Sequence, residues 1–478
     1  MSSPAHSDSA VNDLAWMTAA ELVDAYRQRT VSPVEATRAA LEQIERLDKD
    51  VNAFVLVDAD AALTAARASE RRWRDGVPLS PADGVPASIK DIFLTRGWPT
   101  LRGSHLIDEA GPWPDDAPAV ARLREAGAVL LGKTTTPEFA WKGVTDSSRH
   151  GATGNPWDAR LTAGGSSGGS AAAVGLGMGP WSVGTDGGGS VRIPAAFTGT
   201  VAFKGTYGLV PMYPASPFGT LAHAGPMTRT VTDTALLLDI ITGFDSRDWS
   251  ALPTPVGSFL DGLDDGVRGL RVAFSPTLGY VRNDPEVEGL VRAAARVVEE
   301  AGAVVEEVDP GFAEPVEAFE VLWFAGAAKV VAACGDGALE RVDPGLRRGI
   351  EETGPVSASG YLDATALRTD LGVRMGRFHE TYDLLLTPTL PITAFETGRD
   401  APSGWPSDHW TSWTPYTYPF NMTQQPAVSV PCGLTAAGLP VGLQIVGPRH
   451  ADALVLRAAR AYEVAAGWTL APALVRRS

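Results

Sequence analysis

The sequence Gly164-Gly165-Ser166-Ser167-Gly168-Gly169-Ser170 continues directly into the small apolar residues 171–174, and an apolar run over residues 181–185 follows. A flexible Gly/Ser linker has a similar composition, but a linker does not normally continue into a small-residue helix and an apolar strand. We therefore interpret the stretch as a tight loop that feeds a helix with small side chains, which permit close backbone approach.

A second glycine-rich stretch follows the apolar run, where Asp186 precedes Gly187, Gly188, Gly189 and Ser190. Three consecutive glycines leave the backbone N–H groups uncovered. Such groups can converge on one oxygen atom, which is what an oxyanion hole requires. A structural turn explains this stretch equally well when it is taken alone.

A third stretch, residues 84–91, places Lys90 immediately after an apolar strand. A lysine inside a protein must be paired or neutral, because burying an isolated ammonium group is costly. Taken alone, the simpler explanation is a lysine at a sheet edge that pairs with Asp91.

Strand-like and helical patterns alternate along the chain. Ser32-Pro33-Val34-Glu35 is a typical helix start, and a helix from Asp284 to Gly302 is followed by an apolar run at 303–308. This βαβ pattern predicts an α/β protein whose strands are covered by helices on both sides. Residues 1–13 are expected to form a disordered lead.

The net charge of −16 argues against partners that need a basic surface, namely nucleic acids and anionic membranes. No apolar stretch is long enough to span a bilayer, and residues 1–10 lack the pattern of a signal peptide. Cys334 and Cys432 are expected to be reduced thiols, so a cytoplasmic location is the default expectation.

Taken together, the three stretches resemble the amidase signature family. The family's core pattern matches Gly164–Gly169 and then Asp186, Gly188-Gly189-Ser190-Val191-Arg192 and Pro194. The resemblance covers nearly the whole chain, with further matching blocks at residues 51–54, 132–134, 155–157, 385–389, 420–421 and 438–442. It implies a single large domain over residues 14–478, with a central mixed β-sheet covered by helices on both sides.

The resemblance also implies a catalytic triad. Lys90 would be the base, Ser166 a proton shuttle that follows a cis peptide bond, and Ser190 the nucleophile. The backbone amides of Gly187, Gly188, Gly189 and Ser190 would form the oxyanion hole, and the family positions of Ser167, Asp186 and Arg192 would support the loops. The implied reaction is amide hydrolysis through an acyl-enzyme, extended to carbamates (urethanes) and esters, without a cofactor.

A lysine base places a physical condition on the site. An unperturbed lysine has a pKa of about 10.4, so a base that works near neutral pH needs that pKa lowered by about 2.5–3.5 units. Desolvation can supply this, and an ion pair would oppose it. We therefore expect that neither Asp91 nor Asp186 contacts the Lys90 amine.

The substrate pocket is harder to locate from sequence. Trp141 and the aromatic segment 397–418, with Trp410 and Trp413, suggest a pocket for bulky apolar or aryl groups. Three positions depart from the family pattern: Gly187 stands where threonine is common, Thr135 where asparagine is common, and Gln424, a further pocket candidate, where glycine is common. The glycine at 187 is expected to leave the oxyanion loop looser. The partners expected are small-molecule amides, carbamates or esters, and a homodimer is compatible with the sequence.

Other readings compete with the family resemblance. Residues 127–134 match the P-loop letters of a nucleotide-binding protein, but the apolar strand falls between the glycines, where a P-loop has its phosphate cradle. Residues 165–169 match a nucleophile elbow with Ser167 as nucleophile, but no strand leads into it. The seven histidines show no metal-ligand spacing, so no metal site is expected.

Within the family, the alternative is the glutaminase (A-type) subunit of a tRNA-dependent amidotransferase. Residues 216–227 lack the Ser-Leu-Asp-Gln run associated with those subunits and contain Leu221-Ala222-His223-Ala224-Gly225-Pro226 instead. This difference favours a free-standing amidase.

Overall fold

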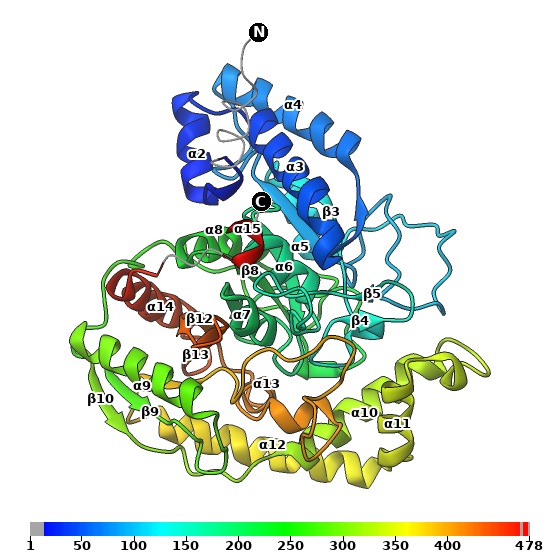
Figure 1. The fold of residues 1–478 in the computed structure, drawn as a ribbon, viewed down its shortest axis with the longest axis vertical. Coiled ribbons are helices and arrows are strands. Elements are labelled where there is room, and N and C mark those ends of the chain that lie inside the picture. The colour runs from blue at the N-terminus through cyan, green and yellow to red at the C-terminus, as the bar shows by residue number, and fades with distance from the viewer. Residues whose placement is uncertain (1–13, 469–471, 477–478) are drawn as a thin grey trace.

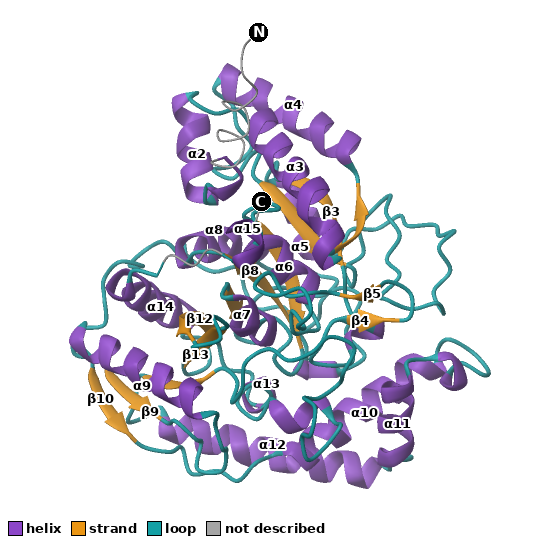
Figure 2. Ribbon diagram, viewed as in Figure 1, coloured by secondary structure: helices purple, strands orange, loops and turns teal. Residues whose placement is uncertain are grey.

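The computed structural model describes residues 14–468 and 472–476 of the chain. The expected disordered lead, residues 1–13, lies outside them. Eleven of the described strands form one large mixed sheet with helices on both faces (Figures 1 and 2), which confirms the predicted α/β class. In spatial order its strands are β1 (Phe54–Val57), β3 (Val129–Thr134), β2 (Pro86–Lys90), β6 (Trp181–Asp186), β8 (His223–Thr228), β7 (Val201–Lys204), β12 (Ala427–Leu434), β13 (Pro440–Val446), β11 (Leu384–Pro388), β9 (Arg271–Phe274) and β10 (Val304–Glu307).

The helices surround this sheet. The longer ones are α2 (Ala19–Gln28), α3 (Pro33–Val51), α4 (Ala59–Asp75), α5 (Pro118–Glu125), α6 (Gly168–Gly175), α8 (Val231–Ile241), α9 (Pro285–Glu300), α10 (Val316–Ala332), α11 (Pro344–Thr353), α12 (Ala358–Phe378) and α14 (Asp452–Ala466). Shorter elements are α7 (Arg192–Thr198), α13 (Pro419–Met422), α15 (Ala473–Arg476) and the hairpin of β4 (Asp146–Ser147) and β5 (Gly151–Ala152). No described helix combines the length and the apolar composition needed to cross a membrane.

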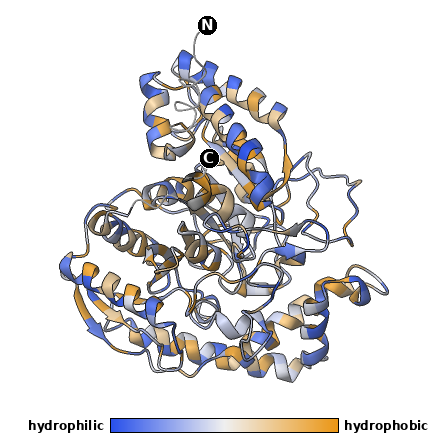
Figure 3. Ribbon diagram, viewed as in Figure 1, coloured by the Kyte–Doolittle hydropathy of each residue, from blue (hydrophilic) through white to orange (hydrophobic). Residues whose placement is uncertain are grey.

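Local sequence explains where the elements begin. The predicted start of α3 is confirmed, because the Ser32 side chain accepts a hydrogen bond from the Glu35 amide while the Glu35 carboxylate accepts one from the Ser32 amide. Strands β2, β3 and β6 are buried along their whole length, which is typical of inner strands covered on both faces. The hydropathy colours of Figure 3 follow this arrangement, since polar residues alternate with apolar ones on the outer helices.

Two halves of the chain meet in the sheet. Strand β2 runs parallel to both β3 and β6, and β7 pairs antiparallel with β12 from the second half. Figure 1 shows the blue N-terminal helices at one end of the molecule and helices α10–α12 at the other. A second core, rich in aromatic residues, joins α10 and α12 to segment 397–418. The candidate site lies where this aromatic core meets the ends of β2 and β6.

Candidate active site

Lys90 is the last residue of β2, and its side chain is fully buried. Its Nζ lies 2.6 Å from the Ser166 Oγ and 2.8 Å from the Thr185 Oγ1. Because β2 and β6 are parallel neighbours, their carboxyl ends lie at the same edge of the sheet, and this brings Lys90 and Thr185 together.

The charge environment of Lys90 meets the condition set by a lysine base. Burial lowers the pKa of Lys90 well below its ordinary value, while the negative charge of Asp186 partly opposes the shift. No carboxylate among the described residues forms an ion pair with Lys90, as predicted. Asp91 instead pairs with Lys133 at 2.9 Å, and Asp186 pairs with Arg192 at 3.0 Å.

The serine-rich loop is anchored to the end of β6. The peptide bond between Gly165 and Ser166 is cis. The Ser167 Oγ donates to the Thr185 carbonyl at 3.1 Å and accepts from the Thr185 amide at 3.2 Å, and the Ser167 amide donates to the Ser190 carbonyl at 3.1 Å. Ser167 therefore joins the loop, the strand and the Ser190 segment, and its fully buried hydroxyl is unlike an exposed nucleophile on an elbow.

Ser166 and Ser190 line the same cleft. Their hydroxyl groups are not hydrogen-bonded to each other, and the Ser190 hydroxyl has no partner among the described residues. Of the expected chain of hydrogen bonds, the link from lysine to Ser166 is formed and the link from Ser166 to Ser190 is not.

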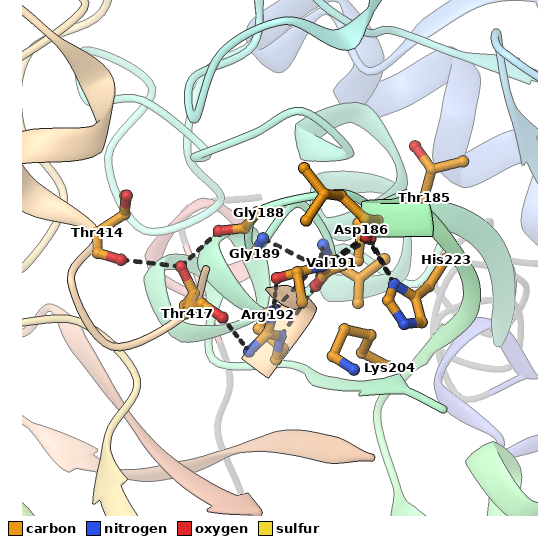
Figure 4. Close-up of polar contacts among 12 residues, drawn as sticks. Thr185, Asp186, Gly188, Gly189, Val191, Arg192, Lys204, His223, Thr414 and Thr417 are labelled. Carbon is orange, nitrogen blue, oxygen red and sulfur yellow. Dashed lines mark hydrogen bonds and ion pairs between the residues drawn. The ribbon is translucent and has the colours of Figure 1, made fainter. Parts of the chain in front are cut away.

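Asp186 organises the loop that precedes Ser190 (Figure 4). Its carboxylate accepts from the Gly189 amide at 2.8 Å, from the Val191 amide at 3.3 Å, and from the Nε and Nη2 of Arg192, both at 3.0 Å. Arg192 holds the pKa of Asp186 well below its usual range, against the effect of burial. The side-chain Nδ2 of Asn421 also donates to the Asp186 carboxylate, at 2.8 Å.

These contacts correct the predicted oxyanion hole at one position. The Gly189 amide donates to Asp186 and is therefore not free to bind an oxyanion. The amides of Gly187, Gly188 and Ser190 have no acceptor among the described residues. The expected donor set is thus reduced to these three amides, because the sequence shows how many amides are uncovered but not which ones already have an acceptor.

Two of the glycines are needed for close packing. A Cβ on Gly187 would lie 2.7 Å from the Trp323 ring, and a Cβ on Gly188 would lie 2.7 Å from the Trp410 ring. The Thr417 hydroxyl donates to the Gly188 carbonyl at 2.6 Å. Glycine at position 187, where the family often has threonine, therefore makes room for Trp323, and the loop is packed rather than loose.

The cleft at Ser166 and Ser190 has an empty volume of about 810 Å³, part of it open to solvent. Its walls are mostly apolar. They are formed by the residues after β2, by the segment around Phe139, by the loop 212–218 and by α10. The lining residues are Ile92, Phe93, Arg102, Phe139, Ala140, Ser166, Thr185, Gly187, Ser190, Met212, Tyr213, Pro214, Ala215, Ser216, Pro217, Phe218, Ala222, Trp323 and Val330.

The four predicted pocket residues are not among those that line this cleft. Trp410 and Trp413 are buried in the aromatic core behind the glycine loop, so segment 397–418 supports the site from the rear. Trp141 packs against α11, while its neighbours Phe139 and Ala140 line the cleft. Gln424 borders a separate hollow beside α12. The prediction that these four residues line the substrate pocket is therefore wrong. Their residue types suggested a pocket, but the sequence does not show which way each side chain points.

Several residues of the site were not predicted. Thr185 contacts the lysine, Trp323 and Phe218 stack with ring centroids 3.9 Å apart in the cleft wall, and Arg102 lies in the same wall. The role of Thr185 could have been predicted from the sequence, since Thr185 is next to Asp186 at the end of the strand beside β2. The position of Trp323 in the cleft could not have been predicted, because Trp323 is distant in sequence from the triad residues.

The P-loop reading is wrong. Residues 129–134 form strand β3, where a phosphate-binding loop would be required. Lys133 is fully buried and hydrogen-bonded to the carbonyl oxygens of Phe93 and Pro99 and the hydroxyl of Thr100, in addition to its ion pair with Asp91.

The fold and this site together define a hydrolase of the α/β class in which a buried lysine, rather than a histidine, is linked to serine. The family model described as Amidase matches residues 35–456, and the chain belongs to this amidase signature family of carbon–nitrogen hydrolases.

Similar proteins include amidases and subunits of amidotransferases. The chain is 37% identical to an acylamidase from Rhodococcus erythropolis, covering 95% of this chain and 97% of that one. It is 40% identical to the A-type subunit of the glutamyl-tRNA(Gln) amidotransferase from Myxococcus xanthus (strain DK1622), covering 94% and 96%. Among solved structures, a bacterial aryl acylamidase of the amidase signature family superposes with a TM-score of 0.89 at 34% identity, covering 95% and 97%.

Proposed function

We propose that this chain is a free-standing amidase that cleaves bulky apolar or aryl amides through an acyl-enzyme on Ser190. The observation that carries the proposal is the buried contact of 2.6 Å between the Lys90 Nζ and the Ser166 Oγ, at the edge of the cleft that also contains Ser190. Desolvation lowers the pKa of this lysine, which favours the neutral amine that a general base requires.

The mechanism moves one proton along the triad. Neutral Lys90 accepts the proton of Ser166 as Ser166 accepts that of Ser190, and the Ser190 Oγ forms a bond to the substrate carbonyl carbon. The developing oxyanion receives hydrogen bonds from the amides of Gly187, Gly188 and Ser190, each worth on the order of 3–4 kcal/mol.

Collapse of this intermediate breaks the carbon–nitrogen bond, and the relay returns the proton to the leaving nitrogen. Water then attacks the acyl-enzyme by the same relay and releases the carboxylic acid. Carbamates and esters pass through an equivalent tetrahedral intermediate, so we include them in the proposal.

The walls of the cleft support the substrate class. Phe93, Phe139, Phe218 and Trp323 give it an aromatic lining, which suits a flat or bulky apolar group better than a small polar amide. Acylamidase and aryl acylamidase are also the names of two similar proteins, which agrees with this preference.

A glutaminase subunit of a tRNA-dependent amidotransferase is the second candidate, because the similarity to the Myxococcus xanthus protein is as close. Residues 221–223, Leu-Ala-His, differ from the run associated with such subunits, and Ala222 and Phe218 contribute apolar surface to the cleft. A small polar substrate such as glutamine gains little from these walls.

The purified chain, assayed with p-nitroanilides, aryl carbamates, primary amides and glutamine, tests the proposal by released amine or ammonia. We expect turnover of aryl amides without a partner protein, and its loss in Ser190→Ala with the circular dichroism spectrum unchanged. A fluorophosphonate should label the parent protein and not Ser190→Ala. Retained turnover in Ser190→Ala, or hydrolysis of glutamine alone, contradicts the proposal.

A further inference from the structure

Arg102 is a charged residue in the otherwise mostly apolar cleft, on the segment that follows β2. Its backbone is fixed on both sides: the Arg102 amide donates to the Asp91 Oδ2 at 2.9 Å, and the Arg102 carbonyl accepts from the Phe139 amide at 2.8 Å. The residue has a φ of 54°, in the left-handed region. The segment is therefore well anchored, and the side chain is directed by a defined backbone.

The guanidinium group of Arg102 has no partner in the part of the chain that the structure describes. Over residues 14–468 and 472–476, nothing accepts a hydrogen bond from it and no carboxylate forms an ion pair with it. A half-buried guanidinium carries five N–H donors and keeps its charge at neutral pH, so leaving it without an acceptor is costly. An unpaired arginine in a catalytic cleft is typical of a group that waits for an anionic ligand.

The surrounding charges do not neutralise Arg102. Asp91 is the carboxylate that interacts most with it, but Asp91 already forms the ion pair with Lys133 and accepts the amides of Leu101 and Arg102. Lys133 and Arg102 therefore share one carboxylate, and Arg102 has no carboxylate of its own in an ion pair among the described residues.

A second carboxylate nearby is also engaged. Glu138 directly precedes Phe139, whose amide donates to the Arg102 carbonyl, but the two Glu138 carboxylate oxygens accept from the Ser104 hydroxyl and the Asp343 amide, both at 2.6 Å. Among the described residues, neither Glu138 oxygen accepts a hydrogen bond from the guanidinium.

We propose that Arg102 binds a carboxylate of the substrate, so that the preferred substrates are amides with a bulky apolar body and one anionic end. This inference rests on the proposed amidase function. The planar fork of arginine matches a carboxylate with two parallel hydrogen bonds. Phe139 and Trp323 line the same cleft and accommodate the apolar body, while Ser190 attacks the carbonyl.

Matched substrates test the inference, because a nitro group has nearly the shape of a carboxylate but no charge. One pair compares 4-acylaminobenzoate with the 4-nitroanilide of the same acid, and places the charge on the amine side. The other pair compares 4-carboxybenzoyl with 4-nitrobenzoyl anilide, and places it on the acyl side. The measured quantity is the ratio of kcat/KM for carboxylate over nitro substrate.

We expect Arg102→Met to lower this ratio by about 10- to 100-fold for one of the pairs, the range expected for a lost charge-assisted hydrogen bond. Arg102→Lys keeps the positive charge but loses the planar guanidinium, so its ratio should lie between those of the parent protein and Arg102→Met. Arg96→Met removes an exposed arginine of the same segment and should leave the ratio as in the parent protein.

The ratio separates this inference from the proposed function, because differences in intrinsic reactivity between the two substrates cancel between variants. An unchanged ratio in both Arg102→Met and Arg102→Lys, with Ser190-dependent turnover of the nitro substrates, overturns the role of Arg102 alone. If the parent protein cleaves none of the four compounds, the proposed function fails and the inference fails with it.

Discussion

Replacement of Asp186 by asparagine tests whether the buried ion pair holds the oxyanion loop. In the substituted protein, the new NH₂ group would face Arg192 in either orientation, because the Arg192 Nη2 donates to Oδ1 and its Nε donates to Oδ2. Arg192 would remain fully buried without its counter-charge.

The expected cost follows from these contacts. Breaking a buried ion pair by removing one partner costs about 3–5 kcal/mol, because the remaining charge is uncompensated. We therefore expect Asp186→Asn to lower the free energy of unfolding by about that amount and to reduce kcat, since the Gly189 and Val191 amides lose part of their anchor. Urea titration followed by tryptophan fluorescence measures the first quantity, and initial rates on an aryl amide measure the second.

Two variants serve as controls. Asp24→Asn removes one partner of the exposed pair with Arg27 and should cost less than about 1 kcal/mol. The double variant Asp186→Asn/Arg192→Met removes both buried charges and should be less destabilised than the sum of its two single variants. A loss below about 1 kcal/mol in Asp186→Asn would refute the reasoning.

Three further outcomes follow from the structure. Thr185→Val removes a hydrogen-bond partner of Lys90, so kcat should fall about tenfold with little change in KM, whereas Thr185→Ser should stay near the parent value; equal rates for both contradict this role. Gln424→Gly should raise the free energy of unfolding by about 0.5–1 kcal/mol in urea titrations, because the φ of Gln424 is 60°; Gln424→Ala should give no such gain, and an equal gain would contradict the backbone explanation. Burial lowers the pKa of His379 from 6.5 to about 4, so the unfolded chain takes up the proton first and stability should fall by at most roughly 3 kcal/mol as the pH drops from 6.5 to 4; the slope should flatten in His379→Gln, and an identical slope assigns the effect to other groups.

The parts of the site that could be predicted from the sequence are those whose residues lie in short, contiguous sequence motifs. Lys90, Ser166 and Ser190 stand in short patterns that combine a strand end with a glycine loop, and the condition that no carboxylate contacts Lys90 followed from the pKa of lysine alone. The helices and strands around them followed from caps and from apolar periodicity, as at Ser32.

The remaining features depend on which surfaces meet in three dimensions. Trp410 looked like a pocket residue by type, but Gly188 allows it to pack behind the loop. Trp323 lies on a helix far along the chain, and only the packing of that helix on Gly187 places it in the cleft. The Gly189 amide could not be excluded from the oxyanion hole until its acceptor, Asp186, was located.

The division of the site between two distant parts of the chain has a consequence for biosynthesis. A ribosome that has passed residue 230 has already made every reacting group, but the wall formed by Trp323 and Val330 is still untranslated. At about 5–20 residues per second, this interval lasts several seconds or more. Strand β7 also lacks its neighbour in the sheet until β12 has been translated, which happens much later. A nascent chain therefore carries Ser190 well before it contains the residues that complete the cleft wall and pair with β7.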